Sequence, residues 1–66
     1  MKEVEKLEYR AQQSGEAYLS TDKIDIKVYS LKMRKGVRYF YFTRNITGDY
    51  AEITRDQLIE LLKNER

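Results

Sequence analysis

The sequence predicts a small α+β domain: an antiparallel β-meander of three to four strands, packed on one face by a C-terminal α-helix. Three observations predict this class. The chain has 66 residues, so we expect residues 1–66 to form one domain. Residues 24–53 are rich in β-branched and aromatic side chains that alternate with polar ones between glycines, as in antiparallel strands. Residues 54–64 place leucines at helical spacing behind a capping motif.

Residues 1–16 are ambiguous between strand and helix, because two periodicities fit them. Met1, Val4 and Leu7 fall on one face of a helix, whereas residues 7, 9 and 11 alternate as they would in a strand. We expect a strand, since a turn around Gly15 would lead directly into a second apolar segment at residues 17–19.

Residues 24–44 predict a β-hairpin around Gly36. The first arm alternates β-branched with more polar residues, and the second arm, residues 37–44, consists almost entirely of residues that favour extended structure. Arg34, Lys35 and Gly36 suit a three-residue loop, in which a type I turn is followed by a glycine in the left-handed conformation. That loop pairs Met33 with Val37.

This register gives the two faces of the hairpin different compositions. One face, called here the Phe face, carries Ile24, Ile26, Val28, Phe40, Phe42 and Ile46. The opposite face, called here the Tyr face because it carries Tyr29, Tyr39 and Tyr41, also carries Leu31, Met33 and Val37. A two-residue turn at Lys35 and Gly36 is the alternative, but it would move the β-branched residues away from the phenylalanines. We therefore prefer the three-residue loop.

A second turn is predicted at Gly48 and Asp49. The chain then returns through residues 50–53, with Ala51 and Ile53 on the Phe face. We therefore expect a further antiparallel strand before the C-terminal helix.

The helix over residues 54–64 begins with a capping box, in which the side chains of Thr54 and Gln57 satisfy each other's backbone N–H groups. Ile53 before the cap and Leu58 after it form a hydrophobic staple. We expect the leucine stripe of this helix to cover the Phe face.

Charge is distributed unevenly along the chain. The net charge is only +2, yet residues 27–44 contain six basic residues and no acid. The other 48 residues hold seven basic and eleven acidic residues, so a segment of +6 is joined to a remainder of −4. Such asymmetry indicates polyanion binding, and a solvated, charged hairpin is the alternative interpretation.

The candidate binding site is this hairpin, residues 27–44. One helix covers only the Phe face, so the Tyr face needs the N-terminal segment, a second copy of the chain, or a partner to cover it. The sequence leaves open whether residues 1–16 do so. The candidate contact residues are Lys27, Tyr29, Lys32, Arg34, Lys35, Arg38, Tyr39, Tyr41 and Arg44.

Two functions fit this surface. The first is contact with DNA or RNA, because bases stack on tyrosine rings while phosphates meet Lys and Arg, and a basic two-stranded ribbon can also enter the major groove. The alternative is an inhibitor of the phage or mobile-element type that binds a host protein through the same Tyr and Arg face. A homodimer formed across the Tyr face is a third possibility for the partner.

Composition argues against catalysis. The chain has no Cys and no His, which excludes disulfides and Cys/His zinc sites and removes the commonest general base and the thiol nucleophile. The three glycines are isolated, so no phosphate-cradling loop is present. We expect no enzymatic activity, cofactor or metal. No apolar run reaches the roughly 18 residues of a membrane span, and we expect a cytoplasmic protein without membrane contact, in the host cytoplasm if the source is viral.

In outline, a three-stranded sheet followed by a helix over about residues 24 to 64 resembles the small DNA-binding domains at the N-terminus of some phage and transposon integrases. The resemblance is one of architecture, and no diagnostic motif accompanies it.

Overall fold

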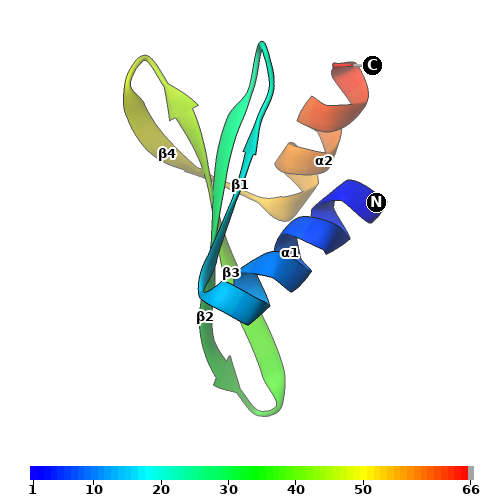
Figure 1. The fold of residues 1–66 in the computed structure, drawn as a ribbon, viewed down its shortest axis with the longest axis vertical. Coiled ribbons are helices and arrows are strands. Elements are labelled where there is room, and N and C mark those ends of the chain that lie inside the picture. The colour runs from blue at the N-terminus through cyan, green and yellow to red at the C-terminus, as the bar shows by residue number, and fades with distance from the viewer. Residues whose placement is uncertain (66) are drawn as a thin grey trace.

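The computed structural model describes residues 1–65, with side chains for residues 1–31 and 35–65. Its elements in chain order are α1 (Lys2–Ser14), β1 (Glu16–Ser20), β2 (Asp25–Arg34), β3 (Val37–Ile46), β4 (Asp49–Ile53) and α2 (Arg55–Asn64). The strands form one antiparallel sheet in the order β1-β2-β3-β4. This arrangement confirms the predicted α+β class, with a four-stranded meander and a C-terminal helix on the sheet (Figure 1).

The strand expected within residues 1–16 is wrong, because this segment forms helix α1. Val4, Leu7 and Ala11 follow the helical spacing and are all buried, whereas Tyr9 is 64% exposed. As a helix, this segment buries one continuous apolar stripe and leaves Tyr9 in solvent. As a strand, it would have placed Tyr9 on the same face as Leu7. Gly15 therefore ends the helix instead of forming a hairpin turn. Its φ of 94° is left-handed, and its N–H donates to the Ala11 carbonyl at 2.7 Å.

The expected register of the β2–β3 hairpin is confirmed in the part away from the tip, where Val28 pairs with Phe42 and Tyr29 pairs with Tyr41. At the tip it is wrong, because Met33 pairs with Arg38 instead of Val37.

The tip differs because the chain closes with a two-residue turn. Lys35 and Gly36 both have positive φ angles, 51° and 76°, as a type I′ turn requires. A bulge between Ser30 and Met33 adds one residue to β2, so the register at the tip differs by one residue from the register in the rest of the hairpin. The two-residue turn therefore keeps the twist that suits a hairpin, and the strands away from the tip still place the Phe and Tyr side chains on opposite faces.

The turn after β3 also begins one residue earlier than expected. Thr47 and Gly48 form it, with φ angles of 49° and 91°, and Asp49 already belongs to β4. Ile53 packs against the core as expected. Ala51 and Ile46 are exposed, because they lie near this turn at the end of the hairpin, beyond the packed core.

Both helices lie on the same side of the sheet (Figure 1), and their buried side chains pack against the Phe face. The buried core consists of Val4, Leu7, Ala11, Ala17, Ile24, Ile26, Val28, Phe42, Leu58 and Leu62. Leucines of α2 cover the Phe face as predicted, and α1 lies beside α2 on the same side of the sheet. Residues 1–16 therefore do not cover the Tyr face, which stays open.

The start of α2 has the predicted capping box. The Thr54 hydroxyl accepts a hydrogen bond from the Gln57 N–H at 3.0 Å, and the Gln57 side-chain oxygen accepts one from the Thr54 N–H at 2.8 Å. Leu58 is fully buried and Ile53 is partly buried against the core, as expected for the staple positions.

The tip of the β2–β3 hairpin projects beyond the rest of the molecule (Figure 1). Strand β1 pairs with β2 only as far as Tyr29, and β4 pairs with β3 only from Phe42 onward. Residues 30–41 consequently form a two-stranded ribbon at one end of a molecule whose longest dimension is 35 Å.

Candidate binding surface

Five of the six tyrosines lie on the Tyr face. Tyr29 pairs directly with Tyr41, and Tyr39 has the same orientation because it lies two residues before Tyr41 in β3. Tyr18 on β1 and Tyr50 on β4 extend this face to both edges of the sheet, since they pair with Lys27 and Asn45. The Tyr18, Tyr39 and Tyr50 side chains are 51%, 48% and 46% exposed.

The centre of the Tyr face is an aromatic cluster around Lys27. The Tyr29 and Tyr41 rings lie 6.1 Å apart at an interplanar angle of 36°. The Lys27 Nζ atom lies 4.9 Å from the Tyr29 ring centroid and 5.3 Å from that of Tyr18. Hydrogen bonding with the Tyr29 and Tyr18 hydroxyls raises the pKa of Lys27 above its ordinary value. Lys27 is therefore held as a cation between two rings.

Acidic and amide groups border this cluster on one side. The Tyr50 hydroxyl donates to Asp25 Oδ2 at 3.0 Å, and the Asn45 side-chain N–H donates to the same oxygen at 3.4 Å. The hydrogen bond to Asp25 raises the pKa of Tyr50. The side-chain oxygen of Asn45 is buried and has no hydrogen-bond partner among the described residues.

The predicted contact residues do not all gather on one face. Lys27, Tyr29, Tyr39 and Tyr41 lie on the Tyr face, and Lys35 lies in the exposed turn. The side chains of Lys32 and Arg34 lie outside those that the structure describes.

Arg38 and Arg44 lie on the Phe face instead. Arg38 Nη1 donates to the Ser30 hydroxyl at 3.0 Å, on the side of the sheet that the helices cover. Arg44 pairs with Ile26, and its side chain lies beside Ile24 and Leu61. The two arginines therefore do not flank the tyrosines, because residues 38 and 44 share the strand parity of Phe40 and Phe42.

The described charges on the Tyr face are mixed. Lys27 is its one cation among the described side chains, and Glu16, Asp25 and Glu52 are its acids, at positions that alternate with core-facing residues. Glu16 lies 4.0 Å from Lys27 Nζ. The basic character of residues 27–44 is thus concentrated at the hairpin tip and on the opposite face.

Tyr18 and Tyr50 were missing from the contact residues expected from the sequence. Tyr18 lies between the core-facing residues Ala17 and Leu19, so alternation in β1 could have located it once β1 was recognised as an edge strand. The face on which Tyr50 lies depends on the position of the turn at Thr47 and Gly48, because that turn sets the register of β4.

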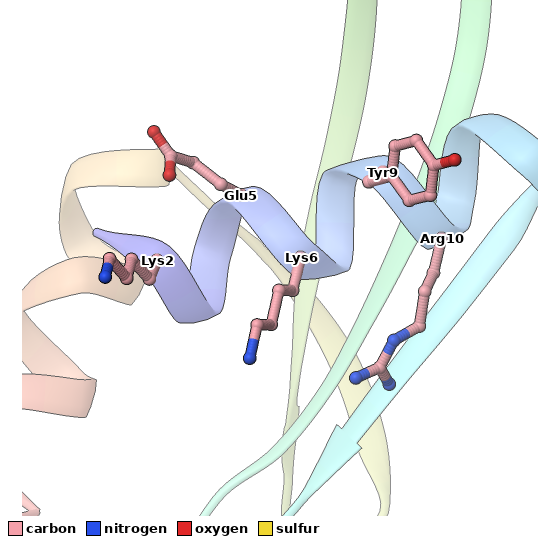
Figure 2. A pocket seen from close by; sticks show the side chains of 5 residues that line it. All are labelled: Lys2, Glu5, Lys6, Tyr9 and Arg10. Atoms are coloured by element: carbon pink, nitrogen blue, oxygen red, sulfur yellow. The ribbon is translucent and has the colours of Figure 1, made fainter.

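The sixth tyrosine, Tyr9, lies on α1 and not on the sheet, and it lines one hollow with Glu16 and Tyr18 at the β1 edge. It lines another, shallow hollow with Lys2, Glu5, Lys6 and Arg10 (Figure 2). Figure 2 shows Lys6 and Arg10 directed away from the Tyr9 ring. All five side chains come from one helix, so they form a solvated helix surface and do not enclose a ligand.

Within residues 1–65, no group of three or more acidic side chains is placed to hold a metal ion. Neither helix of the described chain is long and apolar enough to cross a membrane.

Fold and surface together define a two-layer α+β domain in which two helices cover one side of a four-stranded sheet and the other side is open and aromatic. No protein-family model, curated protein or solved structure matches the chain.

Proposed function

We propose that this chain is a non-enzymatic binding protein that contacts a partner protein through the Tyr face. The observation that carries the proposal is the position of five tyrosines on a sheet face that neither helix covers. Tyrosine is enriched at protein interfaces because its ring buries a large apolar area while its hydroxyl remains hydrogen-bonded. Three of these rings are about half exposed, at both edges of the sheet and toward the tip.

The charges on this face favour protein over nucleic acid. Phosphate contacts need several cations around the aromatic rings. Lys27 is already held between Tyr18 and Tyr29, and Glu16, Asp25 and Glu52 would repel a polyphosphate. A mixture of acidic, basic and hydroxyl groups suits the polar rim of a protein interface.

The proposal is of binding and not of catalysis because the chain lacks His and Cys. The Asp25 carboxylate on the Tyr face accepts hydrogen bonds from Tyr50 and Asn45. That arrangement suits a structural carboxylate rather than a general base.

Affinity capture with matched tyrosine variants tests the proposal. The immobilised chain is incubated with extract of the source cells, or of the host cells if the source is viral, and retained proteins are quantified at low and high salt. We expect one stoichiometric partner to be retained by the wild type and by Tyr9→Ala, the control on α1. Tyr41→Ala should lower the affinity at least about tenfold, as expected for an interface anchor. Equal retention by Tyr41→Ala, Tyr18→Ala and the wild type would overturn the proposal.

The partner could also be a second copy of the chain. Sedimentation equilibrium of the purified protein tests this outcome. A dimer that dissociates in Tyr41→Ala but persists in Tyr9→Ala would identify the Tyr face as a homodimer interface.

A second candidate function is contact with DNA or RNA, favoured by the projecting hairpin. Residues 30–41 carry four basic residues and no acid, on a ribbon that extends beyond both helices (Figure 1). A ribbon of this kind can enter a nucleic-acid groove. Fluorescence anisotropy with single- and double-stranded oligonucleotides across a salt series should then give a log–log slope of about −3 to −4 on duplex DNA. Absence of binding at low salt would exclude this function.

A further inference from the structure

Strand β3 has an unpaired edge at the hairpin tip. Strand β4 pairs with β3 only from Phe42 to Ile46, so residues 37–41 of β3 have β2 on one side and no strand on the other within the described chain. These five residues are about 17 Å long. The chain turns away at Thr54 to begin α2, and this turn leaves the edge open (Figure 1).

The backbone groups that point outward from this edge can be assigned. In a two-residue hairpin the closing pair, here Arg34 and Val37, forms backbone hydrogen bonds with each other. Because the direction alternates along β3, Arg38 and Phe40 direct their N–H and C=O groups away from β2. Phe42 continues this alternation by facing Ile53 of β4. Within the described residues, the outward groups of Arg38 and Phe40 have no hydrogen-bond partner.

A groove of about 370 Å³ lies along the same edge. Phe40, Phe42 and Ile53 contribute apolar walls, and Thr54 lies at the start of α2. The charged side chains of the groove are Arg38, Glu52, and the ion pair of Glu8 with Arg55. Tyr39 and Tyr41 border it on the Tyr face. An extended chain laid along β3 would therefore meet backbone donors and acceptors, apolar side chains and an aromatic border.

Charge selects the occupant of this edge. Residues 30–41 carry Lys32, Arg34, Lys35 and Arg38 without any acid. Pairing of the edge with its copy in a second chain would bring two such ribbons together, which like-charge repulsion disfavours. An acidic segment would instead be attracted to the tip if its carboxylates lie on the side of Arg38, which is opposite to the face that carries Glu16, Asp25 and Glu52.

We propose that an extended acidic segment of a partner protein adds to the free edge of β3 as an additional strand. It would hydrogen-bond to the backbone of Arg38 and Phe40, with a carboxylate opposite Arg38 and apolar side chains over Tyr39 and Tyr41. Strand addition uses main-chain hydrogen bonds for affinity and alternate side chains for specificity. The inference rests on the proposed function, because it names the chemistry of the partner and its mode of binding.

Chemical synthesis of the 66-residue chain permits a direct test. N-methylation of the Phe40 amide removes one outward donor and obstructs strand addition while retaining the side chain. N-methylation of the Ser20 amide is the matched control. Gly15, which precedes β1, accepts a hydrogen bond from the Ser30 N–H at 3.0 Å, so residues 15, 17 and 19 face β2. The Ser20 amide therefore points away from β2, as the Phe40 amide does.

The probe is a fluorescein-labelled peptide of about eight alternating Glu and Val residues, long enough to span the edge. We expect it to bind the wild type and the N-methyl-Ser20 protein equally. The N-methyl-Phe40 protein and Arg38→Glu should each bind at least about tenfold more weakly, and a Lys and Val peptide should not bind. Equal binding by the wild-type and N-methyl-Phe40 proteins, or no binding of the acidic peptide to the wild type, would overturn the inference.

Hydrogen exchange gives a second measurement that needs no variant. The Arg38 and Phe40 amides should exchange at least about tenfold more slowly with saturating peptide, while the Ser20 amide is unchanged. Unchanged exchange at Arg38 and Phe40 would exclude strand addition even if the peptide binds. If the N-methyl-Phe40 protein still captures a partner that Tyr41→Ala loses, the strand-addition mode fails while the proposed function stands.

Discussion

Glu8 of α1 and Arg55 of α2 form a bidentate ion pair across 47 residues of sequence. The Arg55 Nε and Nη2 atoms donate to the two Glu8 carboxylate oxygens, each at 3.1 Å. The hydrogen bond to Glu8 raises the pKa of Arg55, which keeps the guanidinium charged. The pair joins the two helices on the covered side of the sheet.

Glu8→Gln should lower the free energy of unfolding by about 1 kcal/mol, because it replaces a two-pronged, charge-assisted contact at a carboxylate that is mostly shielded from solvent. Urea denaturation measures this change, with Glu60→Gln on the exposed side of α2 as the control. A double-mutant cycle with Arg55→Gln isolates the pair itself. Equal stability of Glu8→Gln and Glu60→Gln would show that the ion pair contributes nothing.

The sequence predicts those features of the fold that depend on local patterns. The capping box of Thr54 and Gln57 is confirmed because both partners lie within four residues. The hairpin register away from the tip is confirmed because strand alternation places Phe42 and Tyr41 on opposite faces. Helix α1 could not be predicted with the same ease, since its apolar stripe is stabilised by a sheet that lies later in the chain.

The candidate site is predictable to a smaller degree. Tyr29, Tyr39 and Tyr41 could be grouped from alternation alone, and the same parity already assigns Arg38 to the opposite face. The bulge after Ser30 could not be predicted from the sequence, because it depends on two conditions that compete: the two-residue turn at the tip and the packing of the strands away from the tip. The free edge of β3 depends on where β4 ends, which is a property of the whole sheet.

Thr47→Asn should stabilise the protein. Thr47 has a φ of 49°, a left-handed conformation that costs a β-branched residue roughly 1–2 kcal/mol, whereas Asn followed by Gly48 is the preferred pair for this turn. The substitution removes a hydroxyl that donates to the Ile46 carbonyl at 2.8 Å, so the net gain should be about 1 kcal/mol. The Tm should then rise by about 4–8 °C. A Tm that falls would indicate that this hydroxyl outweighs the backbone strain.

Gly15→Ala should lower the free energy of unfolding by about 1 kcal/mol. An added Cβ would meet no atom within 4 Å, so the cost comes from the φ of 94° and not from a steric clash. Gly15→Asn should cost less, since Asn tolerates the left-handed region. Thermal denaturation distinguishes the two substitutions, and an equal loss in both variants would contradict the backbone explanation.

Arg44→Met should leave the free energy of unfolding unchanged or raise it by up to about 1 kcal/mol. The Nε atom of Arg44 is buried without a hydrogen-bond partner among the described residues, so its desolvation is not compensated. Met retains an aliphatic side chain in the hollow that Arg44 lines with Ile24 and Leu61, whereas Arg44→Ala removes it and should be destabilising. Equal losses in Arg44→Met and Arg44→Ala would show that the guanidinium itself stabilises the fold.

The hydrogen bond between Tyr50 and Asp25 should make stability depend on pH in the alkaline range. The bond raises the pKa of Tyr50 in the folded state above the unfolded value of about 10. Between these two pKa values the folded state binds the proton more tightly than the unfolded state does. The contribution of the bond to stability is therefore complete below the unfolded pKa and is lost as pH rises through the folded pKa.

Urea denaturation of the wild type and Tyr50→Phe at about pH 8 and about pH 11 tests this expectation, since the two values lie on either side of the unfolded tyrosine pKa. The wild type should be the more stable protein at the lower pH, and its advantage over Tyr50→Phe should shrink at the higher pH. Because Tyr50 and Asp25 border the Tyr face, partner binding should weaken over the same range. An advantage that is independent of pH would contradict the raised pKa.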